Sequence, residues 1–116
     1  MLEAKVFDYE DYKNRLASNY ELMTLVANEF ISEATSLFER LQEAFVSQDW
    51  KSFDDLAHRL RGAALEVSGH KFCQLIREIE ASLEEVHSVS SEMNDDLEYE
   101  FGRLISALRQ RFLLSS

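Results

Sequence analysis

The chain has 116 residues, enough to bury one hydrophobic core, so we expect a single domain over residues 1–116. Acidic residues outnumber basic residues 22 to 12, and the formal net charge of −10 disfavours binding to nucleic acid. Hydrophobic residues make up 46%, but no apolar run approaches the roughly 20 residues of a membrane span and the N-terminus lacks a signal-peptide pattern, so we expect a cytoplasmic protein without membrane insertion.

Helices are the predicted elements throughout. The chain has no proline and only three glycines, Gly62, Gly69 and Gly102, which leaves little room for hairpins. Asp8 is a candidate N-cap for a short first helix that ends at about Leu16. The sequence therefore predicts an all-α chain that begins with this short helix.

Two amphipathic helices follow. Asn19 can cap the first of them, whose predicted apolar stripe is Leu22, Val26, Phe30, Ala34, Leu37, Leu41 and Ala44. Asp49 can cap the next, which begins at Trp50 and whose predicted stripe is Phe53, Ala57, Leu60, Ala64 and Val67. We expect this helix to stop near Ser68 and Gly69, since glycine readily takes the left-handed conformation that ends a helix.

Two further amphipathic helices complete the chain. The predicted stripe of the fourth helix is Phe72, Ile76, Ile79, Leu83 and Val86. Ser90 or Ser91 can cap the fifth, whose stripe is Leu97, Phe101, Leu104, Leu108 and Phe112. Four long helices with short connections predict an antiparallel up-down-up-down four-helix bundle, with the short N-terminal helix covering one end. We expect a monomer, because the stripes can all be buried inside one bundle.

His58 is predicted to face solvent. At about 100° per residue, His58 lies about 140° around the helix axis from Phe53, the centre of the buried stripe. Gly62 is also unusual, because a glycine inside a helix costs roughly 1 kcal/mol relative to alanine. It projects almost opposite the stripe, where a bundle has no neighbouring helix. We interpret Gly62 as clearing space for another molecule to approach the histidine.

These residues suit phosphoryl transfer. An exposed neutral imidazole is a competent nucleophile, and a phosphoryl group on it would be stabilised by a cation one helical turn away. Arg61 supplies that cation. Glu80, on the next helix, is a candidate partner for the other ring nitrogen, which would hold the required tautomer.

The stretch "AHRLRGAA", with His58, Arg61 and Gly62 at its centre, resembles the histidine-containing phosphotransfer (HPt) domain of multistep phosphorelays. The resemblance extends from "FISEATSLFERLQEAFVSQDW" to "LIREIEASLE", about residues 7–86, and the final helix matches only as a generic bundle helix. It implies that His58 accepts a phosphoryl group from a receiver-domain aspartate and passes it to another. Arg61 stands where the family usually has lysine, and Glu80 where members commonly hydrogen-bond the ring. Ser68 stands where the family usually has a second glycine.

The resemblance also implies partners. They would be response-regulator receiver domains, a hybrid sensor kinase, or both, and the Mg²⁺ would belong to the receiver rather than to this chain. We expect a phosphoryl carrier without a cofactor, nucleotide-binding or kinase activity of its own. The sequence has no glycine-rich loop of the kind that binds nucleotide phosphates, which agrees with this expectation. The initiating Met1 and the compact length favour a free-standing carrier over a domain of a larger sensor kinase.

Two alternatives remain open. The first is an adaptor that docks partners without being phosphorylated. The second is a metal-binding bundle, since Glu84 with His87 and Asp55 with His58 have the i, i+3 spacing of di-iron helices. A second Glu-x-x-His is absent and no acid falls within the apolar stripes, so we expect no metal site.

The remaining histidines and the cysteine have no motif around them. We expect His70, in the loop after the third helix, and His87 to have no role in transfer. Cys73 is the only cysteine, which excludes an internal disulfide, and we expect it to be buried.

Overall fold

The computed structural model describes residues 3–112, and over that range the secondary structure is entirely helical. The five helices are α1 (Tyr9–Arg15), α2 (Tyr20–Ser47), α3 (Trp50–Glu66), α4 (His70–Val86) and α5 (Ser91–Phe112). The predicted all-α class and the number of helices are confirmed. Within residues 3–112, no helix combines the length and apolarity that crossing a membrane requires.

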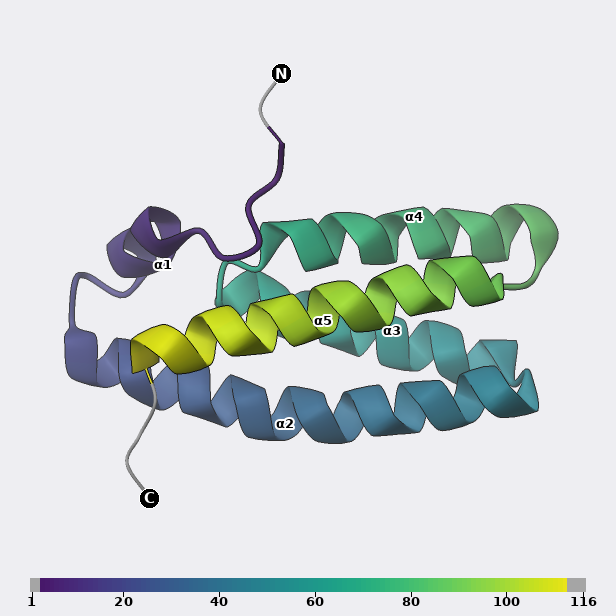
Figure 1. Ribbon diagram of the computed structural model, residues 1–116, viewed down its shortest axis with the longest axis horizontal. Coiled ribbons are helices and arrows are strands. Elements are labelled where there is room, and N and C mark those ends of the chain that lie inside the picture. Colours follow the sequence, from purple (N-terminus) through teal and green to yellow (C-terminus); the bar gives the residue numbers. More distant parts are fainter. Residues whose placement is uncertain (1–2, 113–116) are drawn as a thin grey trace.

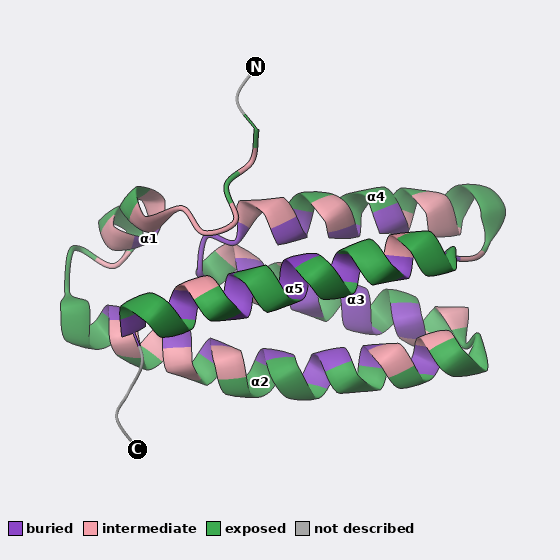
Figure 2. Cartoon of the chain, in the orientation of Figure 1, coloured by how far each residue is buried: buried purple, intermediate pink, exposed green. Residues whose placement is uncertain are grey.

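The four long helices pack around a shared core. Each contacts the next along the chain, and α5 returns to contact α2, which closes the ring. Figure 1 shows consecutive long helices joined by short connections at alternating ends, with α1 beside the start of α2. Buried positions face inward along each helix, and exposed positions face outward (Figure 2). This arrangement leaves the outer face of α3 open to solvent.

Side-chain caps start four of the five helices at the predicted residues, and α4 starts after Gly69 without one. The carboxylates of Asp8 and Asp49 and the amide oxygen of Asn19 each accept a hydrogen bond from the backbone N–H three residues later, at 3.1 to 3.2 Å. Of the two serines proposed to cap the last helix, Ser90 does so, accepting from the backbone N–H of Met93 at 3.1 Å. Each cap satisfies one of the N–H groups that a helix start leaves unpaired.

The core contains most of the predicted apolar stripes, but two helices differ from the prediction. In α2, Leu22 is exposed, whereas Met23 and Ala27 are buried. Met23 lies about 20° around the helix from Phe30 and Leu22 about 80°, so the stripe stays on one face by alternating steps of three and four. In α4, Val86 is 60% exposed and Val89, in the connection that follows, is buried instead.

The turn between α3 and α4 also differs from the prediction. Ser68, not Gly69, takes the left-handed conformation, with φ 57°, whereas Gly69 has φ −85°. Gly69 is needed for its size, because a Cβ there would lie 2.7 Å from Cδ2 of Leu104 on α5. His70 is the first residue of α4, so its placement in a loop was wrong.

Contacts from the N-terminal segment hold Ser68 in place. Its hydroxyl donates to Asp11 at 2.7 Å, and its carbonyl accepts from the backbone N–H of Asp8 at 3.0 Å. Arg15 donates to the carbonyl of Leu65.

Tyr12 of α1 is bonded to α2. Its hydroxyl donates to the carbonyl of Met23 at 2.6 Å, and burial raises the pKa of Tyr12 to about 12. Together with the bonds to Ser68 and Leu65, this bond fixes α1 against α2 and against the turn between α3 and α4.

We expect Gly69→Ala to lower the free energy of unfolding by about 1 to 3 kcal/mol, because the new methyl group would overlap the buried Leu104 side chain. Gly102→Ala is the matched control, because a Cβ at Gly102 meets no atom within 4 Å. It should raise stability by about 0.5 to 1 kcal/mol through helix propensity. Urea denaturation measures both, and a Gly69→Ala chain at least as stable as the wild type would contradict the packing argument.

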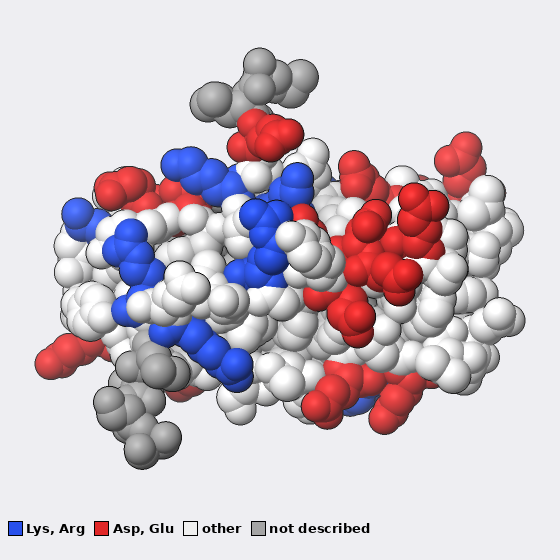
Figure 3. All heavy atoms as spheres, in the orientation of Figure 1, with Lys and Arg blue, Asp and Glu red and all other residues white. Residues whose placement is uncertain are grey.

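Charge is unevenly distributed over the face formed by α4 and α5. Lys and Arg side chains gather over the N-terminal segment and the last turns of α5, and carboxylates gather at the opposite end of the bundle (Figure 3). Arg109 and Arg111 lie in the last turn of α5 and Glu92 in the first, where the helix dipole favours each charge. The net charge of −10 therefore does not describe a uniformly acidic surface.

Candidate functional site

His58 lies on the outer face of α3. Phe53, Ala57, Leu60 and Ala64 are completely buried on the opposite face, and their packing against the other helices fixes the rotation of α3. The side chain of His58 is 68% exposed as a result, which confirms the solvent-facing position predicted from helical phase. The imidazole is accessible to another molecule.

Two charged side chains meet the imidazole at one ring nitrogen. Nη2 of Arg61 lies 3.1 Å from Nδ1 of His58, and Oε2 of Glu80 lies 3.5 Å from the same atom. Nε of Arg61 lies 2.9 Å from Oε1 of Glu80, as an ion pair without the alignment of a hydrogen bond. Over residues 3–112, both of these interactions of the ring involve Nδ1, and neither involves Nε2.

Burial limits how far the two charged partners move. The side chains of Arg61 and Glu80 are 23% and 24% exposed, about a third of the exposure of His58. Arg61 reaches the ring from one turn along α3, and Glu80 reaches it from α4, which packs beside α3. The structure thus brings together His58, Arg61 and Glu80, three of the four site residues predicted from sequence. The contact of Glu80 across the two helices is one that the sequence left open.

Gly62 supplies the open space. It is exposed, and a Cβ built on it would meet nothing within 4 Å. Helix packing therefore does not require glycine here, in contrast to Gly69. The surface one turn after His58 is bare backbone, across which another molecule can approach the ring.

A shallow groove between α3 and α4 adjoins the imidazole. Its volume is about 450 Å³, and it is lined by Asp54, Arg61, Arg77, Glu80, Ala81 and Glu84. Arg77 was missed by the sequence analysis. The available signal was its position three residues before Glu80, which places both side chains on one face of α4. The groove holds two arginines among its carboxylates.

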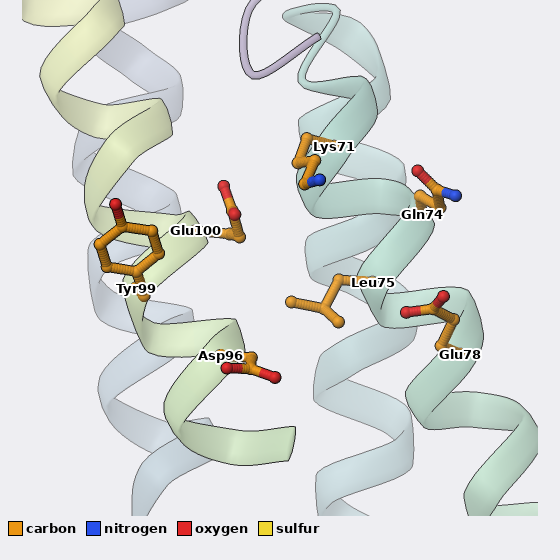
Figure 4. A pocket seen from close by; sticks show the side chains of 7 residues that line it. All are labelled: Lys71, Gln74, Leu75, Glu78, Asp96, Tyr99 and Glu100. Carbon is orange, nitrogen blue, oxygen red and sulfur yellow. The ribbon is translucent and has the colours of Figure 1, made fainter. Parts of the chain in front are cut away.

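A second hollow, between α4 and α5, contains none of the four predicted residues. It measures about 270 Å³ and is lined by Lys71, Gln74, Leu75, Glu78, Asp96, Tyr99 and Glu100. Figure 4 shows the first four side chains on α4 and the last three on α5. Three carboxylates with a single lysine make it unsuited to a phosphoryl group.

The other histidines and the cysteine lie in different surroundings. Nε2 of His70 is 3.4 Å from Asp11, in the contact between α1 and α4, and His87 is exposed at the end of α4. Cys73 is buried, as predicted, and burial raises the pKa of its thiol to about 11. In the described part of the chain, no three His, Cys, Asp or Glu side chains converge in a geometry that could hold a metal ion.

Comparison with known proteins identifies the family. A family model described as "Hpt domain" matches residues 26–111, well over half of the chain. The match includes nearly all of α5, which the resemblance over about residues 7–86 leaves out, and it excludes α1, which that resemblance includes. Searches of curated proteins and of solved structures gave no match. The chain belongs to the Hpt domain family, whose members are phosphocarrier modules of two-component phosphorelays.

Proposed function

We propose that this chain is a phosphorelay intermediate that accepts a phosphoryl group from a receiver-domain aspartate onto His58 and passes it to the aspartate of another receiver. One observation carries the proposal. The imidazole of His58 is 68% exposed, its Nδ1 lies against Arg61 and Glu80, and the position one turn later is Gly62, which has open space around it. The docking-only adaptor needs no such arrangement around a histidine.

The proposed transfer is a nucleophilic displacement at phosphorus. The Nε2 lone pair of His58 attacks, the bond from phosphorus to the aspartyl oxygen breaks, and its electron pair leaves on the aspartate carboxylate. The proton on Nδ1 stays on the ring and forms a hydrogen bond to the Glu80 carboxylate. The negative charge of this carboxylate offsets the positive charge of the imidazolium. Arg61 stabilises the phosphoryl oxygens. Transfer to the next receiver is the reverse reaction.

The proposed partners supply what this chain lacks. Receiver domains, free or in a hybrid sensor kinase, contribute the phosphoryl-bearing aspartate and the Mg²⁺. This chain contributes the nucleophile, one cation and a docking face, and needs neither nucleotide nor cofactor. We also infer that the four long helices form the antiparallel up-down-up-down bundle of a single monomeric domain, which holds α3 and α4 side by side.

Incubation with a phosphorylated receiver tests the proposal against the adaptor alternative. The purified chain is mixed with a receiver carrying labelled aspartyl phosphate and Mg²⁺. We expect label on the chain that is labile in acid and stable in base, and that leaves when a second receiver is added. A stable complex with the receiver in which the chain never acquires label would support the adaptor and exclude the carrier.

Arg61→Ala should shorten the life of the phosphohistidine and slow transfer, each by about ten-fold, because a cation beside the phosphoryl oxygens is lost. The expected effect is smaller than for a donor in an enclosed site because His58 is exposed. Arg59→Ala is the matched control, since Arg59 is an exposed guanidinium on the same helix. Decay of label from isolated phosphorylated chains measures the lifetime. Equal lifetimes for the two variants would leave Arg61 without its proposed role.

A further inference from the structure

Arg61 and Glu80 make incompatible demands on the same ring nitrogen. Arginine is only a hydrogen-bond donor, whereas a carboxylate is only an acceptor. A hydrogen bond from Arg61 therefore needs a lone pair on Nδ1 of His58, and a hydrogen bond to Glu80 needs a proton there. A neutral imidazole carries its proton on one nitrogen at a time, so only one of the two bonds can form.

The choice between the two partners decides which nitrogen is nucleophilic. With Arg61 on Nδ1, the proton lies on Nε2, which then has no lone pair to attack phosphorus. With Glu80 on Nδ1, the proton lies on Nδ1 and the Nε2 lone pair faces solvent. Nδ1 cannot act in its place, because Arg61 and Glu80 both lie against it.

The geometry favours the Arg61 contact in the isolated chain. The distance from Nδ1 to Arg61 is 3.1 Å, within hydrogen-bonding range, whereas the distance to Glu80 is 3.5 Å. Glu80 also holds Arg61 in this place through the 2.9 Å ion pair at Nε. The side chains of Arg61 and Glu80 are each about three-quarters buried, so they move less freely than two fully solvated side chains would.

We infer that Arg61 and Glu80 act as a tautomer switch: in the isolated chain Arg61 keeps the proton of His58 on Nε2, and an arriving phosphoryl group draws Arg61 away from Nδ1. The exposed ring then gains a proton from water at Nδ1, where it is hydrogen-bonded to Glu80, and loses the Nε2 proton to water, which exposes the Nε2 lone pair. This inference rests on the proposed function, because the phosphoryl group is its trigger. A phosphoryl dianion binds a guanidinium more strongly than a neutral ring nitrogen does. Arg61 is thus a positioning residue before transfer and a charge-stabilising residue during it.

The switch raises the population of the nucleophilic tautomer when a phosphoryl group is present. It also accounts for arginine at this position. The fork of a guanidinium lets Nη2 lie on the imidazole while Nε pairs with the carboxylate, which the single ammonium nitrogen of a lysine cannot do in the same geometry. Transfer rates alone do not isolate this role, since removing Arg61 also removes the cation that stabilises the phosphoryl group.

Tautomer populations measure the switch without any partner. The whole chain, with ¹⁵N-labelled histidine, is studied by two-bond ¹H–¹⁵N NMR at about pH 8.5, where free imidazole is neutral. Protonated and unprotonated ring nitrogens have well-separated ¹⁵N shifts. In the wild type we expect the proton of His58 mainly on Nε2. In Arg61→Met, which keeps the packed stem and removes the donor, the ratio of Nδ1–H to Nε2–H should rise by about five-fold, the effect of one net hydrogen bond.

Three controls accompany this measurement. Arg59→Met removes a guanidinium from the same helix and should leave the His58 ratio unchanged. His87, exposed at the end of α4, is an internal reference in every spectrum. The double variant Arg61→Met/Glu80→Ala lacks both partners, so its His58 ratio should return to that of His87. Unchanged chemical shifts in the core show that each variant is folded.

The outcomes separate this inference from the proposed function. A wild-type His58 protonated mainly on Nδ1, or an unchanged ratio in the folded Arg61→Met chain, overturns the switch even if receivers label His58. Failure of receivers to label His58 overturns the proposed function, whatever the tautomer ratio. A five-fold rise confined to Arg61→Met supports the switch.

Discussion

His58→Gln is expected to abolish phosphorylation of the chain by a phosphorylated receiver, a loss of at least about 1,000-fold in labelling. The amide of glutamine matches imidazole roughly in size but offers no nucleophilic nitrogen, so it cannot form the covalent intermediate. Folding should be unaffected, because the side chain at this position is 68% exposed and glutamine is the better helix former. Circular dichroism and thermal melting check the fold, and acid-labile label after incubation with the receiver measures transfer.

The other histidines provide matched controls for this result. His87→Gln removes an exposed imidazole at the end of α4, and His70→Gln removes one that lies 3.4 Å from Asp11. Both variants should take up label as the wild type does, although His70→Gln should lose some stability with its contact to Asp11. Label that persists in His58→Gln and disappears in either control would assign the phosphoryl group to another residue.

Gly62→Leu should slow transfer by roughly 100-fold, because a small displacement of the reacting groups lowers the rate by about that factor. The same change should stabilise the fold. The side chain would project from the turn after His58, over a surface that is now bare. Replacing a mid-helix glycine should raise the free energy of unfolding by about 0.5 to 1 kcal/mol. Gly62→Ala should share the gain in stability with a smaller loss of rate. Bimolecular transfer rates and melting temperatures measure the two effects.

Gly102→Leu is the control for a leucine added to an open helix position. Gly102 also has no atom within 4 Å of an added Cβ, but it lies on α5 and outside the groove beside His58. It should gain stability as Gly62→Leu does and transfer phosphoryl groups at the wild-type rate. If both leucine variants transfer at that rate, Gly62 does not serve to admit a partner.

Local sequence rules predicted the starts of α1, α2, α3 and α5, although not of α4, and they predicted the side of α3 that faces solvent. Asp8, Asn19 and Asp49 cap their helices because an N-cap hydrogen bond depends on residues within one turn. His58 faces solvent because the buried stripe of α3 sets its rotation. Both properties are fixed within a single helix, so capping preferences and helical periodicity were sufficient.

Properties that depend on two helices could not be predicted in this way. The choice between Gly69 and Ser68 for the left-handed residue depends on Leu104 of α5 and on the bonds that Ser68 makes with the N-terminal segment. The 3.5 Å approach of Glu80 to His58 depends on the relative height and rotation of α3 and α4. Side-chain packing between α3 and α4 sets this height and this rotation. Sequence spacing could name Glu80 as a candidate and could not give its distance.

The most direct measurement is to locate the phosphoryl group on the intact wild-type chain after transfer from a receiver, by ³¹P and ¹H–³¹P correlation NMR. The account predicts one phosphoryl group per chain, bonded to Nε2 of His58. Its phosphorus should couple to both carbon-bound ring protons, since Nε2 lies between the two carbons that carry them, whereas Nδ1 adjoins only one. A phosphoryl group on Nδ1, on His70 or His87, or on no residue of the chain would contradict the account.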